Sequence, residues 1–269
     1  YLSAIGYQSD EKKYNTFWPV NFHLIGKDIL TTHSVYWPTM LMSAELPLPK
    51  GIFAHGWWLS DQTKMSKSLG NVVDPLDLID TYGVDPIRFY LMKEMVLGQD
   101  ANFSMDSFIK CYNSDLANDL GNLLSRVTNL IFKFYDGALE PDLDDSSDGD
   151  ELKKAALVSI NTSKELMNDL KINDAISSVF IFIRRVNKYL EITAPWKLVK
   201  TNKKSAGKIL FTAAESLRII ALLLYPVMPN RTEAVLSALG AKNRELEWGK
   251  LVFEKKVLQQ KPLFPRIES

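Results

Sequence analysis

The chain has 269 residues, 46% of them hydrophobic and 24% charged, which is an ordinary composition for a globular protein and unlike that of a disordered one. Its 32 basic and 32 acidic residues cancel, so overall charge indicates neither a nucleic-acid nor a membrane partner. The single cysteine, Cys111, excludes an intrachain disulfide and a Cys-rich zinc site. The longest apolar stretch, residues 219–228, is too short for a transmembrane helix of about 18 residues or more.

The first 110 residues alternate short apolar runs with Gly and Pro, a pattern typical of mixed strands and helices. FHLIG at 22–26 predicts a strand that feeds a helix over about 27–42, with Asp28 as the N-cap. GIFAHGWWL contains a second predicted strand, which runs from residue 52 to 59. This part of the chain is therefore expected to be α/β.

From about residue 107 to 241, apolar residues recur at spacings of three and four, which is the helix period. The pattern starts with Leu116 and Leu120 and resumes in 151–170, 173–192 and 205–225. It predicts a bundle of four or five helices. Residues 136–151 contain eight acidic and no basic side chains and are expected to form a solvated loop.

The pentapeptide KMSKS at 64–68 follows the second predicted strand. Its two lysines are three residues apart, so in a loop both can reach one polyanion, and the serine hydroxyls add hydrogen-bond donors. An isolated K-x-x-K is usually a solvated surface loop. The full pentapeptide, followed by LGNVVDP, favours a loop that stabilises departing phosphate.

KMSKS followed by LGN resembles the second signature of class I aminoacyl-tRNA synthetases. Together with FHLIGKDILTTHSVYWP, HGWW, NDLGNLLSR, NKYLEITAPWK and LFPRI, it resembles methionyl-tRNA synthetases over nearly the whole chain. The resemblance implies the C-terminal half of a Rossmann-like catalytic domain, followed by an α-helical anticodon-binding bundle. It also implies methionine–tRNA ligase activity: ATP activates L-methionine to methionyl-adenylate, and the methionyl group passes to the 3′ end of tRNA(Met).

The resemblance assigns the ATP site to the segments around the two predicted strands. Lys64 and Lys67 are the implied catalytic residues that hold the phosphates, and the loop is implied to close on ATP as a lid. Trp57 and Trp58 lie in the segment whose backbone meets adenine in the family. The implied ATP-binding residues are Gly26, Asp28, Trp58, Lys64, Ser66, Lys67 and Ser68.

Ile29, His33 and Trp37 are spaced four residues apart, so a helix would place them on one face. Such a stripe, considered alone, is usually core. In the family this stripe, with an aromatic residue that matches Tyr1, lines the pocket for the methionine side chain. A thioether forms only weak hydrogen bonds, so apolar shape and aromatic–sulfur contacts must select it.

The resemblance also assigns an anticodon site. Asn122 and Arg126, one helical turn apart, match a pair that reads anticodon bases, and Trp196 matches a stacking platform. Residues 184–208 contain eight basic residues and one acidic residue, Glu191, which leaves a local charge of +7. A basic stretch with an embedded Trp is typical of RNA binding, although a solvated helix face is an alternative.

The first class I signature, H-I-G-H, does not occur in the sequence, and HLIG at 23–26 is not a substitute for it. The chain begins at Tyr1 without a signal-peptide pattern. We expect it to lack the N-terminal half of the synthetase, which is then a partner, and to be catalytically incomplete alone. Two alternatives remain: a non-catalytic tRNA-binding module, and another class I synthetase, for isoleucine, valine or leucine.

The predicted division has four parts: 1–79, half of the catalytic domain; 80–112, a connecting module; 113–246, the anticodon-binding bundle; and 247–269, a tail that packs back on the body. ATP is expected to bring Mg²⁺, since this ion is usually held with substrate phosphates. No zinc or other metal site and no membrane contact are expected. A bacterial cytoplasm is the simplest location, and an organelle matrix is also compatible with the pattern.

Overall fold

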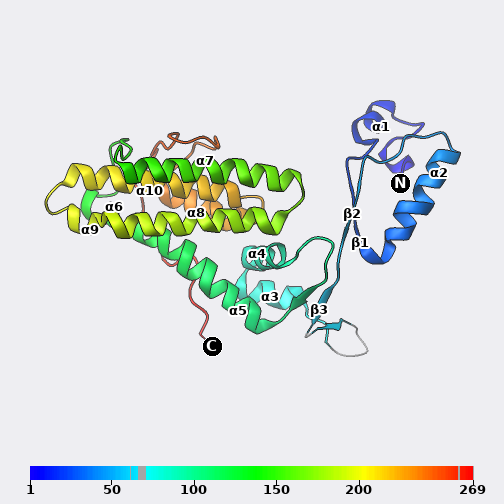
Figure 1. Cartoon of the computed structure of the whole chain (residues 1–269), viewed down its shortest axis with the longest axis horizontal. Helices are drawn as coiled ribbons and strands as arrows, with labels where there is room; N and C mark the ends of the chain where they lie inside the picture. Colours follow the sequence, from blue (N-terminus) through cyan, green and yellow to red (C-terminus); the bar gives the residue numbers. More distant parts are fainter. Residues whose placement is uncertain (61, 66–70, 260, 269) are drawn as a thin grey trace. The chain divides into compact units, whose positions relative to one another are not determined.

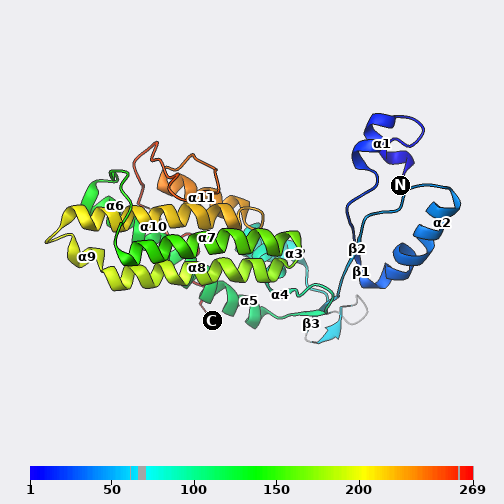
Figure 2. The same ribbon diagram turned by 45° about the horizontal axis from the view of Figure 1, so that its top comes forward.

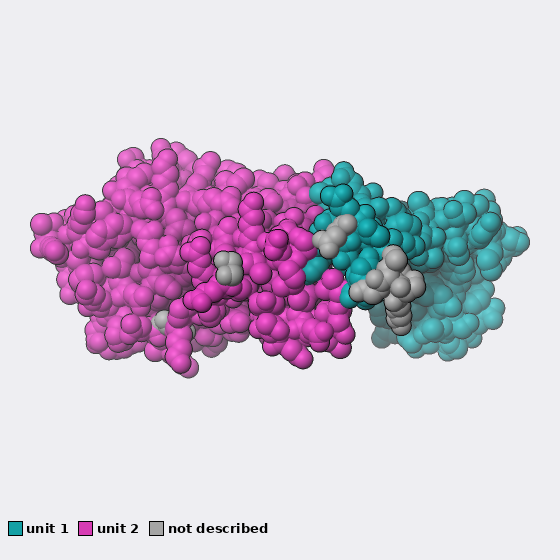
Figure 3. All heavy atoms as spheres, turned by 90° about the horizontal axis from the view of Figure 1, so that it is seen from below, with its two compact units in different colours: residues 1–72, 95–103 teal, residues 73–94, 104–269 magenta. Residues whose placement is uncertain are grey.

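The computed structural model describes residues 1–60, 62–65, 71–259 and 261–268. The chain divides into two compact units, which are coloured separately in Figure 3. Unit 1 comprises residues 1–72 and 95–103, and unit 2 comprises residues 73–94 and 104–269. Each unit is therefore assembled from two segments of the chain.

Unit 1 contains a parallel pair of strands, β1 (His23–Gly26) and β2 (Ile52–His55), with His23 opposite Ile52. Parallel strands need a crossover connection, here formed by helical segments. Before the pair lie η1 (Ser3–Ile5) and α1 (Glu11–Phe17), and the crossover consists of 3₁₀ helix η2 (Lys27–Ile29), π-helical η3 (Thr32–Tyr36) and α2 (Trp37–Ser43). The predicted strand and helix over 22–42 are confirmed.

Asp28 does not cap this helical segment, contrary to the prediction. The segment begins at Lys27, Gly26 occupies the capping position, and no side chain caps the first turn. The Asp28 carboxylate lies against Gly26 instead: a Cβ at position 26 would be 2.5 Å from its Oδ1. Glycine at position 26 thus leaves room for the carboxylate at the carboxyl end of β1.

The single strand expected over 52–59 is in fact two strands. β3 (Trp58–Ser60) pairs with β4 (Thr63–Lys64) and with β5 (Ala101–Phe103), whereas β2 pairs with β1. The break lies at Gly56, which passes so close to Gln99 that a Cβ would be 2.0 Å from the Gln99 carbonyl oxygen. Only glycine permits this approach of residues 99–100.

Unit 2 begins with α3 (Pro75–Tyr82) and α4 (Val84–Glu94) and continues after β5. Three consecutive helical segments follow: α5 (Met105–Cys111), the π-helical η5 (Tyr112–Gly121) and α6 (Asn122–Tyr135). They form one continuous helix that begins at α5, below the bundle in Figure 1, and continues into the bundle as α6. The predicted repeat of leucines over this stretch is buried, with Leu116, Leu120 and Leu123 at most 1% exposed.

The bundle of unit 2 is built on three long helices that run side by side in both ribbon views (Figures 1 and 2). They are α7 (Ser147–Asn168), α8 (Ile172–Thr193) and α10 (Lys203–Leu224). The short α9 (Pro195–Leu198) connects α8 to α10, and α11 (Pro229–Leu239) follows. The expected fold class, α/β followed by a helical bundle, is confirmed.

The acidic loop is shorter than predicted, because α7 begins at Ser147 rather than after residue 151. The Ser146 hydroxyl accepts a hydrogen bond from the Gly149 N–H (3.3 Å) and caps the helix. Asp148 and Asp150 lie in the first turn, where negative charge is stabilised by the helix dipole. The acidic run therefore marks a helix start as well as a loop.

The tail packs on unit 2. The Tyr112 and Phe264 ring centroids are 6.0 Å apart, and the Asn113 amide exchanges two hydrogen bonds with the Ile267 backbone.

Closer to the bundle, the Arg218 and Glu215 side chains form a fully buried ion pair (2.7 Å) on α10. Together they bind four backbone groups of residues 245–250: the Glu245 and Glu247 carbonyls, and the Gly249 and Lys250 N–H groups. The four-part division of the chain stays a prediction.

Among the described residues, no helix combines the length and the apolar character that a membrane crossing would require.

Candidate functional site

Lys64, the first lysine of the predicted phosphate-binding loop, lies on β4 and is exposed. Its ammonium group is 4.1 Å from the centroid of the Trp57 ring. Lys27, which follows β1, places its ammonium group 4.3 Å from the same ring. The other predicted loop residues, Ser66, Lys67 and Ser68, lie outside the described residues.

The predicted ribose contacts, Gly26 and Asp28, are neighbours at the carboxyl end of β1. The carboxyl ends of parallel strands are where α/β sheets bind ligands. Asp28 is exposed, so its carboxylate can accept hydrogen bonds from sugar hydroxyls. Trp58 is half-buried on β3, in the same unit.

Tyr1, which the family resemblance assigns to the pocket, and His33 and Trp37, which the helical spacing groups, belong to one aromatic cluster of unit 1. The Tyr1 and Trp37 ring centroids are 6.4 Å apart, in an edge-to-face arrangement. Two further residues complete the cluster. The ring centroid of His23 lies 5.8 Å from that of Tyr1 and 5.9 Å from that of His33. The ring centroids of Trp18 and Trp37 are 6.1 Å apart.

Ile29 relates differently to this cluster. Its carbonyl group is 3.0 Å from His33 Nδ1, so its backbone helps to orient the imidazole. Its side chain is 43% exposed, and the rings gather around His23 instead. The helical stripe of Ile29, His33 and Trp37 thus contributes two rings and one backbone contact.

His23 is central to the cluster because it accepts a hydrogen bond from the Trp37 indole N–H at Nε2 (3.2 Å). This bond requires an unprotonated Nε2. Burial lowers the pKa of His23, and the nearby His33 lowers it further. Both effects keep His23 neutral and preserve its bond to Trp37.

Sequence reasoning assigned no role to Trp18, His23 and Lys27, and none to the ring of Trp57. HLIG at 23–26 resembles the H-I-G-H signature only superficially, so the sequence gives no reason to assign a role to His23. A usable signal was the alternation along β1, which places His23 and Ile25 on one face of the strand. No pattern in the sequence predicts Lys27 beside Trp57, since that contact depends on how β2 and β3 are separated.

Of the residues predicted to read the anticodon, Asn122 and Arg126 lie on α6 and Trp196 lies on α9. Asn122 is exposed at the start of α6, and Arg126 is one turn further on. The Arg126 guanidinium lies 5.3 Å from the Trp196 ring centroid and 3.8 Å from the Glu191 carboxylate. Trp196 is half-buried, so part of its surface remains accessible to a ligand.

The position of Trp196 depends on a tight turn between α8 and α9. Ala194 has the left-handed conformation (φ 41°, ψ 57°), which is rare for a residue with a Cβ. Pro195, which is buried, occupies the first position of α9, where its fixed φ suits a helix start. The turn therefore presents Trp196 at the start of a rigid helical segment.

The local charge of residues 184–208 is partly neutralised within the fold. Arg184 pairs with Asp119 (2.9 Å) and Asp115 (3.2 Å), and Lys208 pairs with Asp145 (3.2 Å). The remaining basic side chains form no ion pair within the described part of the chain and can contact phosphates. They are Arg185, Lys188, Lys197, Lys200, Lys203 and Lys204.

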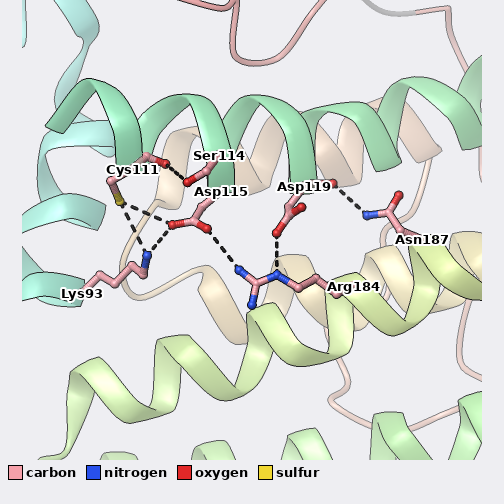
Figure 4. A network of polar contacts seen from close by, with 7 residues as sticks. All are labelled: Lys93, Cys111, Ser114, Asp115, Asp119, Arg184 and Asn187. Carbon is pink, nitrogen blue, oxygen red and sulfur yellow. Dashed lines mark hydrogen bonds and ion pairs between the residues drawn. The ribbon is translucent and has the colours of Figure 1, made fainter. Parts of the chain in front are cut away.

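Figure 4 shows the network around Arg184, which joins α4, α5, η5 and α8. Lys93 of α4 hydrogen-bonds to Asp115, whose other oxygen binds Arg184. Cys111 donates to Asp115 (3.5 Å), and burial raises the pKa of this thiol to about 12. The cysteine is therefore a packed, unreactive part of the network.

No three His, Cys, Asp or Glu side chains of the described residues are grouped so that they could hold a metal ion. The candidate site residues that the structure describes therefore form two groups in unit 1, the aromatic cluster and the two lysines at the Trp57 ring. In unit 2 they form the contact between Arg126 and Trp196.

Two family descriptions match the chain. Residues 1–128 match the family "tRNA synthetases class I (M)", and residues 144–261 match "Anticodon binding domain of methionyl tRNA ligase". The whole chain aligns with the methionine–tRNA ligases of Clostridium acetobutylicum, at 45% identity, and Bacillus subtilis, at 40%. It spans only 43% and 42% of their lengths, respectively.

The solved structures agree. Methionyl-tRNA synthetase of Mycobacterium tuberculosis, in a crystal structure with methionyl-adenylate, superimposes with a TM-score of 0.91 at 32% identity. The match covers 98% of this chain and 54% of that one. The α/β unit is thus part of a class I synthetase domain, and the bundle is an anticodon-binding domain. The chain belongs to the methionyl-tRNA synthetase family, as a part that spans less than half of the Clostridium and Bacillus proteins.

Proposed function

We propose that the protein to which this chain belongs is a methionine–tRNA ligase. It activates L-methionine with ATP to methionyl-adenylate and transfers the methionyl group to the 3′ end of tRNA(Met). The observation that carries the proposal is the aromatic cluster of Tyr1, Trp18, His23, His33 and Trp37, in the same unit as the Gly26–Asp28 turn.

The cluster suits methionine because aromatic rings attract a polarizable thioether sulfur and offer an apolar surface. Tyr1, at 62% exposure, has a face available to a ligand, and Ile29 is exposed nearby along the chain. His33 adds one polar group near the sulfur. In this assignment Tyr1, Ile29, His33 and Trp37 bind methionine, and His23 orients Trp37.

ATP binds beside this pocket. Asp28 accepts hydrogen bonds from the ribose hydroxyls, Gly26 allows the sugar to approach, and the segment of Trp58 meets adenine. Lys64 and Lys67 stabilise the charge that develops as the methionine carboxylate attacks the α-phosphate and pyrophosphate leaves. Ser66 and Ser68 shape the loop, which closes on ATP as a lid. Mg²⁺ arrives with ATP, held mainly by its phosphates.

The bundle binds the anticodon of tRNA(Met). Trp196 stacks on an unpaired base, and Asn122 and Arg126 form hydrogen bonds with base edges. The unpaired lysines and Arg185 attract the phosphate backbone around the loop.

Unit 1 exposes apolar side chains that a finished domain would cover, including Leu24 (68%), Tyr36, Met40 and Met42. Such exposure of several large apolar side chains favours an interface at this part of unit 1. We propose that the N-terminal half of the catalytic domain covers it, with residues 1–79 as the other half, 80–112 as a connector, and 113–246 and 247–269 as the anticodon-binding domain and tail. Because the relatives named above are bacterial, we place the protein in the bacterial cytosol.

The test is amino-acid-dependent ATP–pyrophosphate exchange on the native full-length protein, beside a Lys67→Ala variant. Exchange with methionine alone, lost in the variant, is the expected result. Exchange with isoleucine or valine would contradict the methionine pocket. If the protein binds the anticodon stem-loop but shows no exchange with any amino acid, the ligase proposal is wrong. The protein would then be a non-catalytic tRNA-binding module.

A further inference from the structure

Trp57 carries two cations. The ammonium groups of Lys27 and Lys64 lie 4.3 and 4.1 Å from its ring centroid, within the range of cation–π attraction. The two lysines come from different places in unit 1: Lys27 follows β1, and Lys64 is on β4. The ring is therefore the point at which both charges converge.

The backbone of Trp57 is fixed on both sides. Its N–H donates to Asp100 Oδ1 (2.8 Å), and its carbonyl accepts from the Ala101 N–H (2.9 Å). This contact depends on Gly56, where any Cβ would collide with residues 99–100. The backbone of Trp57 is thus held by the fold, independently of the two cations at its ring.

The two ammonium groups at the ring have one ion-pair partner among the described residues. Asp100 pairs with Lys27 at 2.6 Å, and hydrogen bonds from Lys27 and the Trp57 N–H lower the pKa of this carboxyl. Within the described ranges, Lys64 has no ion pair. Among the described residues, Asp100 is thus the only carboxylate paired with either ammonium group, and an anion bound by both lysines would balance the second charge.

We propose that Trp57 is a positioning residue for nucleotide binding: its ring holds Lys64 and Lys27 together as a pair that receives the polyphosphate of ATP. This inference rests on the proposed function and extends it, because it assigns Lys27 to the phosphates and makes Trp57 act through both lysines. A lysine on a free four-carbon stem samples many rotamers. A ring beneath its ammonium group restricts them before the nucleotide arrives.

The experiment measures methionine-dependent ATP–pyrophosphate exchange in the full-length protein, with kcat and the KM values for ATP and methionine. Trp57→Leu is expected to lower kcat/KM for ATP by about two- to thirtyfold, the range of cation–π contacts. The KM for methionine should stay within about twofold, as the methionine pocket does not include Trp57. Trp57→Phe should recover part of the loss, and Trp248→Leu, the same change in unit 2, should have no effect.

Two readouts separate positioning from packing. Fluorinated tryptophans inserted at position 57 keep the size of the ring and weaken its negative face, so kcat/KM for ATP should fall with each added fluorine. In a Lys64→Ala, Lys27→Ala background, Trp57→Leu should cost almost nothing further. A flat fluorine series, or fully additive losses, would overturn the proposal.

If the unmodified protein shows no exchange, the ligase proposal fails, and titration with inorganic tripolyphosphate tests Trp57 independently. Weaker binding by the Trp57→Leu protein would support the lysine pair. Equal binding by both proteins would overturn it.

Discussion

Arg126 is held before any ligand arrives. Its guanidinium lies between the Trp196 ring and the Glu191 carboxylate, at 5.3 and 3.8 Å respectively. The side chain is 24% exposed, whereas that of Glu191 is 68% exposed, so this ion pair is weak and easily exchanged for a base or a phosphate. The pair orients Arg126 at little cost to a later ligand.

Replacement of Trp196 tests the assigned platform. Trp196→Ala should weaken binding of the tRNA(Met) anticodon stem-loop by about 1–3 kcal/mol, the value of one stacked base. Fluorescence anisotropy with a labelled stem-loop would measure the loss. Trp196→Phe, which keeps a smaller stacking surface, should lose less. Equal affinity of all three proteins would show that the ring does not stack on RNA.

The lowered pKa of His23 predicts that the stability of unit 1 depends on pH. Its pKa is lowered in the folded chain, mainly by burial, so the unfolded chain binds more protons below about pH 6.5. Stability should therefore be complete above that pH and decrease as the pH falls toward the folded pKa, where the bond to Trp37 is lost.

Thermal unfolding between pH 7.5 and 5 would measure this effect. In the His23→Gln variant, whose amide does not titrate, the loss below pH 6.5 should be smaller than in the unmodified chain. An identical pH profile for both proteins would contradict the assignment to His23.

At the scale of elements, the three- and four-residue spacing of apolar residues predicted the positions of the long helices to within a few residues. The predicted 173–192 and 205–225 correspond to α8 (Ile172–Thr193) and α10 (Lys203–Leu224). The two π-helical stretches were not predictable, since the same leucine spacing fits either kind of turn. Such stretches are frequent at functional sites, and here η3 contains His33 and η5 directly precedes Asn122.

The sequence also did not predict features that depend on close contact between distant parts of the backbone. The break between β2 and β3 depends on Gly56 meeting Gln99, 43 residues later, and nothing local indicates that contact. Ile29, His33 and Trp37 could be grouped from the sequence because they recur every fourth residue, but only His33 and Trp37 contribute rings to the aromatic cluster. Trp18 and His23 come from other segments and join only through the tertiary structure.

The buried Arg218–Glu215 pair fixes the irregular segment after α11. Arg218→Met would leave the Glu215 charge buried without its partner, which should cost about 3–5 kcal/mol of unfolding free energy. Urea denaturation would measure this change.

Arg244→Met provides the matched control. Its ion pair with Glu233 (2.7 Å) is 45% and 49% exposed, so it should contribute less than about 1 kcal/mol. Similar losses in both variants would mean that burial does not determine the strength of these pairs.

For the whole molecule, the division into two units predicts that binding of the anticodon stem-loop and ATP–pyrophosphate exchange can be separated. Unit 2 contains the contact between Arg126 and Trp196 and its own core, whereas unit 1 exposes several large apolar side chains, among them Leu24 and Met40. Sequence comparison within the chain could establish the family and the order of its parts. It could not locate the boundary, because unit 1 includes residues 95–103, which return after α3 and α4.

The chain of 269 residues, purified alone, should bind the anticodon stem-loop but show no appreciable ATP–pyrophosphate exchange. We expect this result because the proposed function assigns the rest of the catalytic site to the N-terminal half of the domain. Filter binding and isotope exchange on the same preparation would measure the two activities. Full exchange by this chain would show that it holds a complete catalytic site.

The left-handed turn at Ala194 sets a limit on how far this domain can be stabilised. A Cβ in that conformation costs about 1–2 kcal/mol, which glycine would avoid. Glycine would also let the turn adopt other conformations, and Trp196 would lose its fixed direction. Ala194→Gly should therefore relieve backbone strain in this turn and at the same time free the direction of Trp196, so one residue links local strain to the placement of that ring.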